Sequence, residues 1–411
     1  MENFLRLLLV FVILQVSYRS SVLCSKKSTV LMSVSDDMDQ TFFAQVLDTK
    51  LELHVWHTES KKLEVNSDNP LQALLLMEAP KLEVFVFHPN HHLRQLVVRF
   101  CTLDGLAKDF LNLQELSVLQ IEQCRLNGTF NLGELIALHN LTSFSLEANR
   151  LTETVLQLDE IPDEPEQGSK LAILNLSFNK IKYFNLNVLR LFPALKELFL
   201  SHNALATVEG SIFLPELVKL DIKQNLLDVL DISGCNCSSL LYLYASNNRL
   251  MSFPIFSETT LNIDVLDLGN NRLTVANGKE LQKQRKLTTL ILSWNAFSSF
   301  TTDDENELEI ELASLHDLDL SSNQLKSLDL RDWKLPSLSR LHVSNNPLKV
   351  IPDDLMERYP NLTKLVCFCP DIDCAWIQHN VEHIRSGNFE MSVVWQGPTM
   401  VGKDYRCVTV P

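Results

Sequence analysis

A hydrophobic pattern of nearly constant spacing recurs along most of the chain. In each copy apolar residues stand at the first, fourth and sixth positions, and an Asn usually stands at the ninth, as in LKELFLSHNAL from Leu195 to Leu205. Eleven full copies begin 22 to 30 residues apart, and a truncated copy begins at Leu362. Their first residues are Leu93, Leu116, Leu141, Leu171, Leu195, Leu217, Leu240, Ile263, Leu287, Leu315 and Leu338. So many copies predict a repeat architecture.

The residue types within one copy predict its local structure. Alternation such as Leu198-Phe199-Leu200 points one side chain inward and the next outward, as a short strand requires. Successive strands then lie about 4.8 Å apart in a parallel sheet. The ninth-position amide stands where the chain leaves the sheet, and it can bond backbone groups that no ladder reaches. This Asn column comprises Asn149, Asn179, Asn203, Asn225, Asn248, Asn271, Asn295, Asn323 and Asn346, with Cys101 and Cys124 at its first two positions.

The second half of each copy predicts a short return segment. Steps such as Phe192-Pro193 and Leu335-Pro336 favour irregular or short helical turns over a long helix. No copy can bury its apolar face alone, so stability must come from stacking. This is the leucine-rich repeat. The predicted fold is an α/β solenoid: a horseshoe with a parallel concave β-sheet, short or irregular convex segments and a disulfide-tied C-terminal cap.

The two ends of the chain differ from the repeats. Arg6 and the apolar run Leu7 to Leu14 predict a signal peptide over residues 1–24, cut after Cys24. Residues 25–92 are interpreted as an N-terminal cap with degenerate repeats, residues 93–366 as the repeats, and residues 367–411 as a cysteine-containing cap. No later stretch is apolar enough to span a bilayer, which predicts a secreted, extracellular product without membrane insertion.

Cysteines and sequons fit an oxidising compartment. Removal of Cys24 leaves eight cysteines, an even number. The predicted C-terminal disulfides involve Cys367, Cys369, Cys374 and Cys407, whose pairing is left open. Cys235 and Cys237 are expected to pair elsewhere or stay free, and Cys101 and Cys124 to form a disulfide or two buried thiols, with thiols slightly favoured. The candidate glycosylation sites are Asn127, Asn140, Asn175, Asn236 and Asn361.

Charge and missing motifs exclude several function classes. A net charge of −15 disfavours nucleic acid and anionic membranes as partners. No phosphate loop, nucleophile elbow or paired CxxC occurs, so we expect no catalysis and no cofactor. The HPNHH run at His88 and the Asp371–Asp373 pair are interpreted as surface features rather than metal sites. The acidic insertions 159–169 and 301–311 are expected to be solvated loops or, alternatively, part of a contact.

Outward strand positions predict a binding surface on the concave face. Aromatic side chains on a sheet surface indicate contact anchors, although they can also simply cover one another across strands. Charged neighbours include Lys219, Asp221, Lys223, Asp319 and Arg340. The candidate binding residues are Phe178, Phe199, His202, Tyr242, Tyr244, Asp267, Trp294 and His342. Asn175 is expected on the same face, where a glycan would mask the part near Phe199.

Two short stretches resemble one known family. The run Cys235-Asn236-Cys237 that leads into Leu241–Asn248 resembles the mid-array cysteine segment of the mosquito leucine-rich-repeat immune proteins. The closing Cys407–Pro411 is similar to the cysteine-valine-proline element after their repeats. The resemblance implies a haemolymph protein that binds complement-like thioester proteins or another leucine-rich-repeat chain. Because no heptads or double-cysteine motif follow, the chain looks like a coil-less member.

The combined prediction is a secreted binding protein for innate-immune recognition or scaffolding, with complement-like or pathogen-associated proteins and microbial surface glycans as expected partners. The alternatives are an extracellular-matrix or adhesion protein and an inhibitor that acts by surface complementarity.

Overall fold

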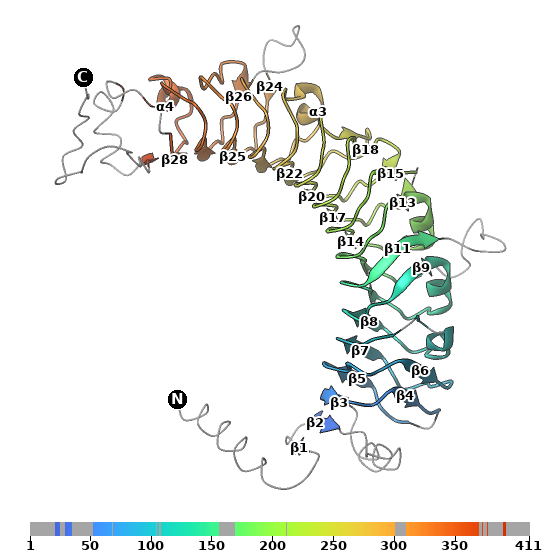
Figure 1. Cartoon of the computed structure of the whole chain (residues 1–411). Coiled ribbons are helices and arrows are strands. Elements are labelled where there is room, and N and C mark those ends of the chain that lie inside the picture. The colour runs from blue at the N-terminus through green and yellow to red at the C-terminus, as the bar shows by residue number, and fades with distance from the viewer. Residues whose placement is uncertain are drawn as a thin grey trace, which may run out of the picture. The chain divides into compact units, whose positions relative to one another are not determined.

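The computed structural model describes residues 21–24, 29–34, 52–67, 69–103, 105–106, 108–155, 169–210, 212–300, 310–369, 372, 376 and 389–391. The chain divides into two compact units. Unit 1 contains Met1–Ile181 with Leu191–Leu195, and unit 2 contains Lys182–Arg190 with Lys196–Pro411. Each unit is a stack of turns in which one short strand per turn pairs in parallel with the next (Figure 1).

Unit 1 begins its parallel stack well before Leu93. Its strands pair successively in the order β2 (Thr29–Val34), β3 (Glu52–Thr58), β5 (Ala73–Leu76), β7 (Gln95–Arg99), β8 (Val118–Glu122), β10 (Ser143–Ser145) and β12 (Ile173–Asn175). A further strand, β1 (Ser21–Cys24), pairs antiparallel with β2. The segment interpreted as a cap with degenerate repeats therefore contains three parallel strands of the stack, of which β2 and β5 were not expected.

Unit 2 continues the same construction. Its parallel strands are β14 (Glu197–Phe199), β17 (Lys219–Asp221), β20 (Tyr242–Tyr244), β22 (Val265–Asp267), β23 (Thr289–Ile291), β25 (Asp317–Asp319), β27 (Arg340–His342), β28 (Lys364–Cys367) and β29 (Phe389–Met391). The middle residues from Leu198 to Leu365 point inward and are at most 4% exposed. These leucines form the core that no single turn could bury alone.

The Asn column holds neighbouring turns together within each unit, as the sequence predicts. Asn225 donates to the carbonyls of Leu200 and Ile222 at 3.0 and 2.9 Å, and its oxygen accepts the Leu205 N–H at 3.0 Å. Asn248 bonds Ile222, Ala245 and Leu227 in the same way. The column residues are mostly buried, so each amide satisfies backbone groups that water cannot reach.

Short return segments close each turn, as predicted. The helices are η1 (Lys108–Asn112), η2 (Leu132–Ala137), η3 (Leu186–Leu191), α3 (Gly278–Gln282) and α4 (Leu355–Arg358). Proline-containing turns lead from the return segment into the next strand. In two of them the carbonyl of Leu214 accepts the Leu217 N–H at 3.1 Å, and the carbonyl of Leu335 accepts the Leu338 N–H at 3.1 Å. These are turns with proline at the second position, where its fixed φ fits.

Paired strands on the return side were not expected from the sequence. In unit 1 they are β4 (Lys62–Val65) with β6 (Val84–Phe87), and β9 (Asn127–Asn131) with β11 (Arg150–Val155). In unit 2 they are β13 (Tyr183–Asn185) with β15 (Thr207–Glu209), β16 (Ile212–Phe213) with β19 (Cys235–Asn236), β18 (Asp231–Ile232) with β21 (Ile255–Phe256), and β24 (Ile310–Glu311) with β26 (Trp333–Lys334).

Several sequence predictions concern residues outside those that the structure describes. They are residues 1–20 of the signal peptide, most of both acidic insertions, Asp371 and Asp373, and the cap cysteines Cys374 and Cys407. These predictions remain predictions. Among the described residues, no helix has the length and hydropathy needed to cross a bilayer.

Candidate binding site

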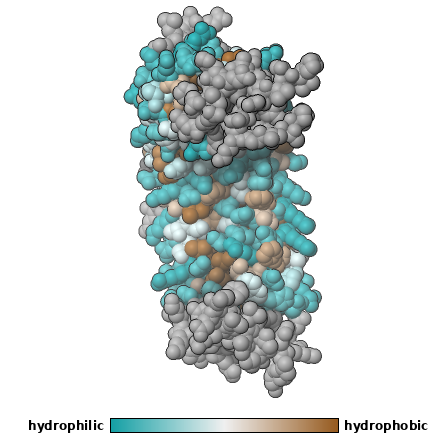
Figure 2. Space-filling view, turned by 90° about the vertical axis from the view of Figure 1, so that its left-hand side faces the viewer, coloured by the Kyte–Doolittle hydropathy of each residue, from teal (hydrophilic) through white to brown (hydrophobic). Residues whose placement is uncertain are grey.

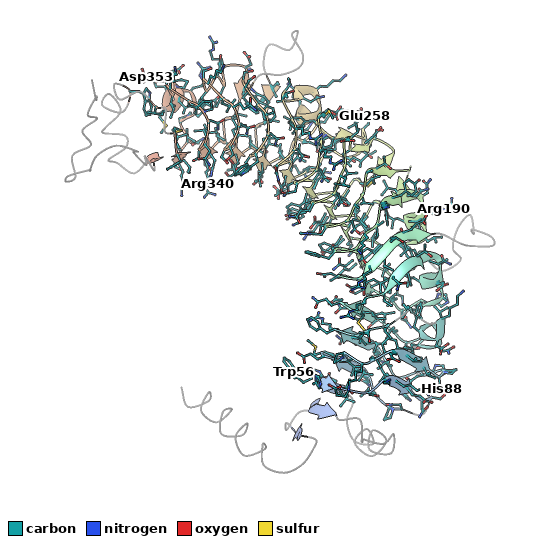
Figure 3. The ribbon with its side chains drawn as sticks, in the orientation of Figure 1. Trp56, His88, Arg190, Glu258, Arg340 and Asp353 are labelled. Atoms are coloured by element: carbon teal, nitrogen blue, oxygen red, sulfur yellow. A yellow bond between two sulfur atoms is a disulfide. The ribbon has the colours of Figure 1, made fainter. Side chains whose placement is uncertain are left out.

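The outward side chains of the unit 2 strands form one surface, here called the sheet face. In-register pairing places them in two rows. The first row is Glu197, Lys219, Tyr242, Val265, Thr289, Asp317 and Arg340, and the second row is Phe199, Asp221, Tyr244, Asp267, Ile291, Asp319 and His342. Arg340 stands on this face, whereas Arg190 and Glu258 lie on the opposite, return side (Figure 3). Figure 2 shows separate apolar patches among polar residues on the side to which it is turned.

One end of the sheet face carries an aromatic–lysine cluster, defined as Phe199, Lys219, Asp221, Lys223 and Tyr244. The Lys219 ammonium lies 4.6 Å from the centroid of the Phe199 ring and 5.6 Å from that of Tyr244. The Lys223 ammonium lies 5.4 Å from the Tyr244 centroid and 3.3 Å from Asp221 Oδ2. Partial burial raises the pKa of the Tyr244 hydroxyl, so this group stays a hydrogen-bond donor at neutral pH.

Cation–π contacts hold this cluster in order before any partner arrives. Each such contact contributes about 0.5–1 kcal/mol at an exposed site. Because Lys219 stands between two rings on neighbouring strands, it restricts both rings and itself. The cluster therefore presents two half-buried aromatic faces and two ammonium groups on a rigid sheet.

Carboxylates at the strand ends have a structural role that the sequence reading did not assign. Asp267 Oδ1 accepts the Gly269 N–H at 3.0 Å, and its Oδ2 accepts the Ser246 hydroxyl at 2.7 Å. Asp319 accepts the Ser321 N–H at 2.9 Å, and Asp221 accepts the Lys223 N–H at 3.3 Å. These side chains cap the turn that follows each strand. The structure therefore gives Asp267 a positioning role in the fold beside its predicted place on the face.

The other end of the sheet face is charged. Arg340 Nη1 donates to Asp317 Oδ2 at 2.9 Å across neighbouring strands, and His342 Nε2 lies 3.9 Å from Asp317 Oδ1. Both partners are substantially exposed, so this pair adds little stability and remains accessible to a ligand. Between the two ends lie the uncharged Val265, Thr289 and Ile291, together with Asp267.

Three predicted sheet residues belong to a different surface. Phe178, His202 and Trp294 were assigned to outward strand positions, but each follows its strand by several residues and has a positive φ, at 57°, 55° and 58°. The period-two alternation ends with the strand, so it cannot be extended to these positions. Phe178 also lies in unit 1, whereas His202 and Trp294 lie in unit 2.

The structure corrects two cysteine predictions. Cys101 and Cys124 form a disulfide rather than two thiols, because the stacked turns bring their Cα atoms to 4.1 Å. Cys235 and Cys237 bond each other, although they were expected to pair elsewhere or stay free. Their Cα atoms are 5.4 Å apart, within the usual disulfide range. At the C-terminal end, Cys367 pairs with Cys369, with Cα atoms 5.3 Å apart.

The five candidate glycosylation sites differ in exposure. Asn127 and Asn361 are exposed, and Asn140, Asn175 and Asn236 are half-buried. The Asn175 amide donates to Glu147 Oε2 at 2.7 Å, and its oxygen accepts the Ser177 N–H at 3.0 Å. The Asn361 amide likewise donates to the Pro336 carbonyl at 2.8 Å. A glycan would replace one N–H of a hydrogen-bonded amide at either site.

Sequence reasoning missed two features of unit 1. Trp56 on β3 is 63% exposed and stands on the strand side, opposite His88 (Figure 3). His57, next to it, bonds Glu59 at 2.8 Å and Glu78 at 3.1 Å. Both lie in the segment interpreted as a cap, where no Asn column marks the register. Of the HPNHH run, His88 pairs with Glu64 at 3.1 Å, and no group of three metal-ligating side chains occurs among the described residues.

Comparisons with known proteins agree with the repeat. Residues 193–250 match the family described as leucine rich repeat. The fold is that of a leucine-rich-repeat protein. Similar structures include a leucine-rich-repeat protein of Leptospira interrogans (21% identity, 81% of this chain and 88% of that one, TM-score 0.56) and the leucine-rich-repeat domain of APL1B (21%, 75% and 84%, 0.55). At this identity the likeness concerns the fold alone.

Curated leucine-rich-repeat relatives match more restricted regions. Rat (Rattus norvegicus) osteomodulin is 29% identical over 58% of this chain and 55% of its own length. The mouse (Mus musculus) platelet glycoprotein Ib alpha chain is 31% identical over 31% of this chain and 16% of its own length. Human (Homo sapiens) Toll-like receptor 8 is 31% identical over 27% and 11%. The chain thus spans about half of the length of osteomodulin and less than a fifth of the length of the other two relatives.

Proposed function

We propose that this chain is a secreted binding protein for innate-immune recognition or scaffolding, and that it binds proteins through the sheet face of unit 2. The aromatic–lysine cluster is the observation that carries the proposal. Leucine-rich-repeat solenoids act as binding scaffolds rather than as enzymes, because a row of rigid strands displays side chains over a long surface.

The cluster has the properties of an interface anchor. Aromatic residues contribute most to protein interfaces when they are already ordered, because less conformational entropy is lost on binding. Phe199 and Tyr244 supply the rings, and Lys219 and Lys223 supply positive charge on a chain whose net charge is −15. The matching partner surface is apolar with carboxylates at its edge.

The proposed partner is a complement-like thioester protein of the haemolymph. This part rests on the resemblance of the Cys235–Asn248 and Cys407–Pro411 stretches to the mosquito immune proteins. Another leucine-rich-repeat chain is the alternative partner on the same grounds.

A pull-down with matched variants tests the proposal. The full chain is immobilised, incubated with haemolymph and compared with Tyr244→Ala, Lys219→Ala and Lys326→Ala. Loss of a central aromatic anchor weakens binding about 30-fold, since such residues contribute about 2 kcal/mol. Tyr244→Ala should lose the captured thioester protein, Lys219→Ala should lose most of it, and Lys326→Ala, an exposed residue away from the sheet face, should keep it. Equal capture by all four proteins would contradict the proposal.

A matrix function is the second candidate. The similarity to osteomodulin over 58% of this chain favours it. The same experiment with collagen fibrils separates the two: capture on collagen that Tyr244→Ala abolishes, without capture of a thioester protein, would support the matrix function instead.

A further inference from the structure

A second surface of unit 2 runs along the edge of the sheet, one residue before the Asn column. We call it the rim stripe: Gln224, Asn247, Asn270, Trp294, Ser322 and Asn345. All six have a positive φ between 51° and 58°. The N–H of each donates to a carbonyl of the next turn, for example Asn247 to Gly269 at 2.8 Å and Asn270 to Ser293 at 2.7 Å. Successive members therefore lie side by side on adjacent turns.

Trp294 is an energetically unfavourable residue for this stripe, because its backbone has a positive φ. The left-handed region costs an L-residue about 1–2 kcal/mol, and Asn tolerates it best among residues other than glycine. Three stripe members are Asn, as expected. Trp294 is 64% exposed, and within the part of the chain that the structure describes its indole has no ring or cation contact and no hydrogen-bond partner. A bulky residue that strains the backbone without packing is best explained by ligand binding.

The neighbours of Trp294 complete a polar site. Asn270 Nδ2 donates to Asn247 Oδ1 at 2.6 Å, which fixes both amides on the turns beside Trp294. The remaining N–H groups of Asn247 and the amide oxygen of Asn270 have no partner among the described residues. Gly269, Ser293 and Ser321 precede the stripe residues on these turns, so only small side chains flank the indole on the sheet side.

We propose that Trp294, Asn270 and Asn247 bind a neutral carbohydrate. The stripe from Gln224 to Asn345 carries no formal charge on a chain of net charge −15. An exposed indole offers a flat apolar face to the C–H side of a sugar ring. Fixed amides offer both donors and acceptors to its hydroxyl groups. Nothing in the stripe would attract or repel a charged ligand.

A protein contact at Trp294 fits these observations less well. Aromatic anchors at protein interfaces are surrounded by a ring of packed residues that excludes water. Around Trp294 the stripe and the residues that precede its members offer amides, hydroxyls and a glycine, which stay hydrated and suit a polyol. The site is also separate from the aromatic–lysine cluster of the sheet face, so the two proposals can fail independently.

Titration of the full chain with neutral oligosaccharides tests the proposal. The probes are a β-1,3-glucan hexasaccharide, an α-mannan hexasaccharide and a chitin hexasaccharide, followed by calorimetry and intrinsic tryptophan fluorescence. We expect at least one to bind with a fluorescence shift. Trp294→Asn should weaken the affinity for that oligosaccharide at least tenfold, and Asn270→Ala should weaken it severalfold. Trp294→Phe should weaken it less than Trp294→Asn does. Tyr244→Ala, in the aromatic–lysine cluster, should bind the sugar normally.

The stability readout separates a binding role from a structural one. Because Asn suits a positive φ, Trp294→Asn should have a melting temperature equal to or above that of the unmodified chain. The proposal is overturned if none of the three probes binds at millimolar concentration, or if Trp294→Asn binds normally. It is also overturned if Trp294→Asn unfolds the protein while Trp294→Phe binds normally, or if Trp294→Asn instead loses the protein partner captured from haemolymph.

Discussion

The Asn column and the rim stripe occupy successive residues of the same turns, yet they follow opposite rules. Asn248 and Asn271 point inward, are buried, and bond four backbone groups each. Asn247 and Asn270, one residue earlier, have a positive φ and are more exposed. The column is occupied by Asn in nine turns, whereas the residue before it, which also has a positive φ, varies among Ala, Phe, His, Gln, Asn, Trp and Ser.

This difference separates stability from recognition along the chain. A buried amide that serves two turns leaves no freedom for substitution, because its loss would leave a buried backbone N–H unpaired and remove donors from the carbonyls that neighbouring column residues share. The stripe needs only a residue that tolerates the left-handed region, so its chemistry is free to serve a ligand. The predictions below test this separation in order of decreasing effect.

Substitutions at the first two column positions, Cys101 and Cys124, should have the largest effect on the free energy of unfolding. Cys101 and Cys124 form a disulfide across 23 residues, and Cys124 Sγ also lies 3.8 Å from the Val98 carbonyl, the type of carbonyl that a column Asn would bond. Cys101→Ala with Cys124→Ala should lower the free energy of unfolding by about 3 kcal/mol or more. The double change to Asn should lose less, because each amide can replace the column bonds. Denaturant unfolding measures both. Equal losses would show that these positions are not equivalent to the column.

Gln224 tests the backbone requirement of the stripe. Its φ is 54° and its side chain is exposed. Gln224→Gly should be unchanged or stabilised by up to about 1 kcal/mol, since glycine adopts this region without strain. Gln224→Val should be destabilised by about 1–2 kcal/mol because a β-branched residue fits it poorly. Melting temperatures of the two variants check this, and a Val variant as stable as the Gly variant would contradict the assigned conformation.

The smallest expected effect is the pH dependence of stability that His57 contributes in unit 1. The hydrogen bond that the His57 ring donates to the Glu59 carboxylate, supported by a second one to Glu78, raises the pKa of His57 above its ordinary value of 6.5. Lys81 also pairs with Glu59, at 2.6 Å. A raised pKa in the folded state means that the stabilisation is fully present below pH 6.5 and is lost as the pH rises through the folded value. The melting temperature should therefore fall slightly more between pH 6 and pH 8 than it does in His57→Gln. Identical falls would remove His57 from this role.

The repeats from Leu93 onward were predictable because their signal is redundant. Each strand has three apolar positions and a column residue, and the structure places the inward leucines and the Asn amides as expected. The strand β5 was missed because Ala73–Leu76 is continuously apolar and no column Asn follows it. The return-side strand pairs were missed because two or three residues carry no periodicity, and their pairing depends on the stacking itself.

The candidate site was only partly predictable. Alternation correctly assigned Phe199, Tyr242, Tyr244, Asp267 and His342 to the outward rows of unit 2. It failed for Phe178, His202 and Trp294, because the backbone leaves the extended region before those residues. Nothing in the sequence pattern marks that change except the Asn that follows each of them. The bonds that occupy Asp267, and the two ring contacts of Lys219, depend on neighbouring turns and cannot be read from one repeat.

Equilibrium unfolding of Asn271→Ala and Asn270→Ala tests the separation of the two columns most directly. The residues are adjacent, and the substitution is the same. Asn271→Ala leaves the buried Leu250 N–H unpaired. It also removes one of the two amide donors from the carbonyls of Ala245 and Leu268, which keep Asn248 and Asn295, so it should cost about 3 kcal/mol. Asn270→Ala should cost about 1 kcal/mol or less, from the loss of a surface amide bond and the poorer fit of alanine to a positive φ. Equal costs, or a larger cost for Asn270→Ala, would contradict the account.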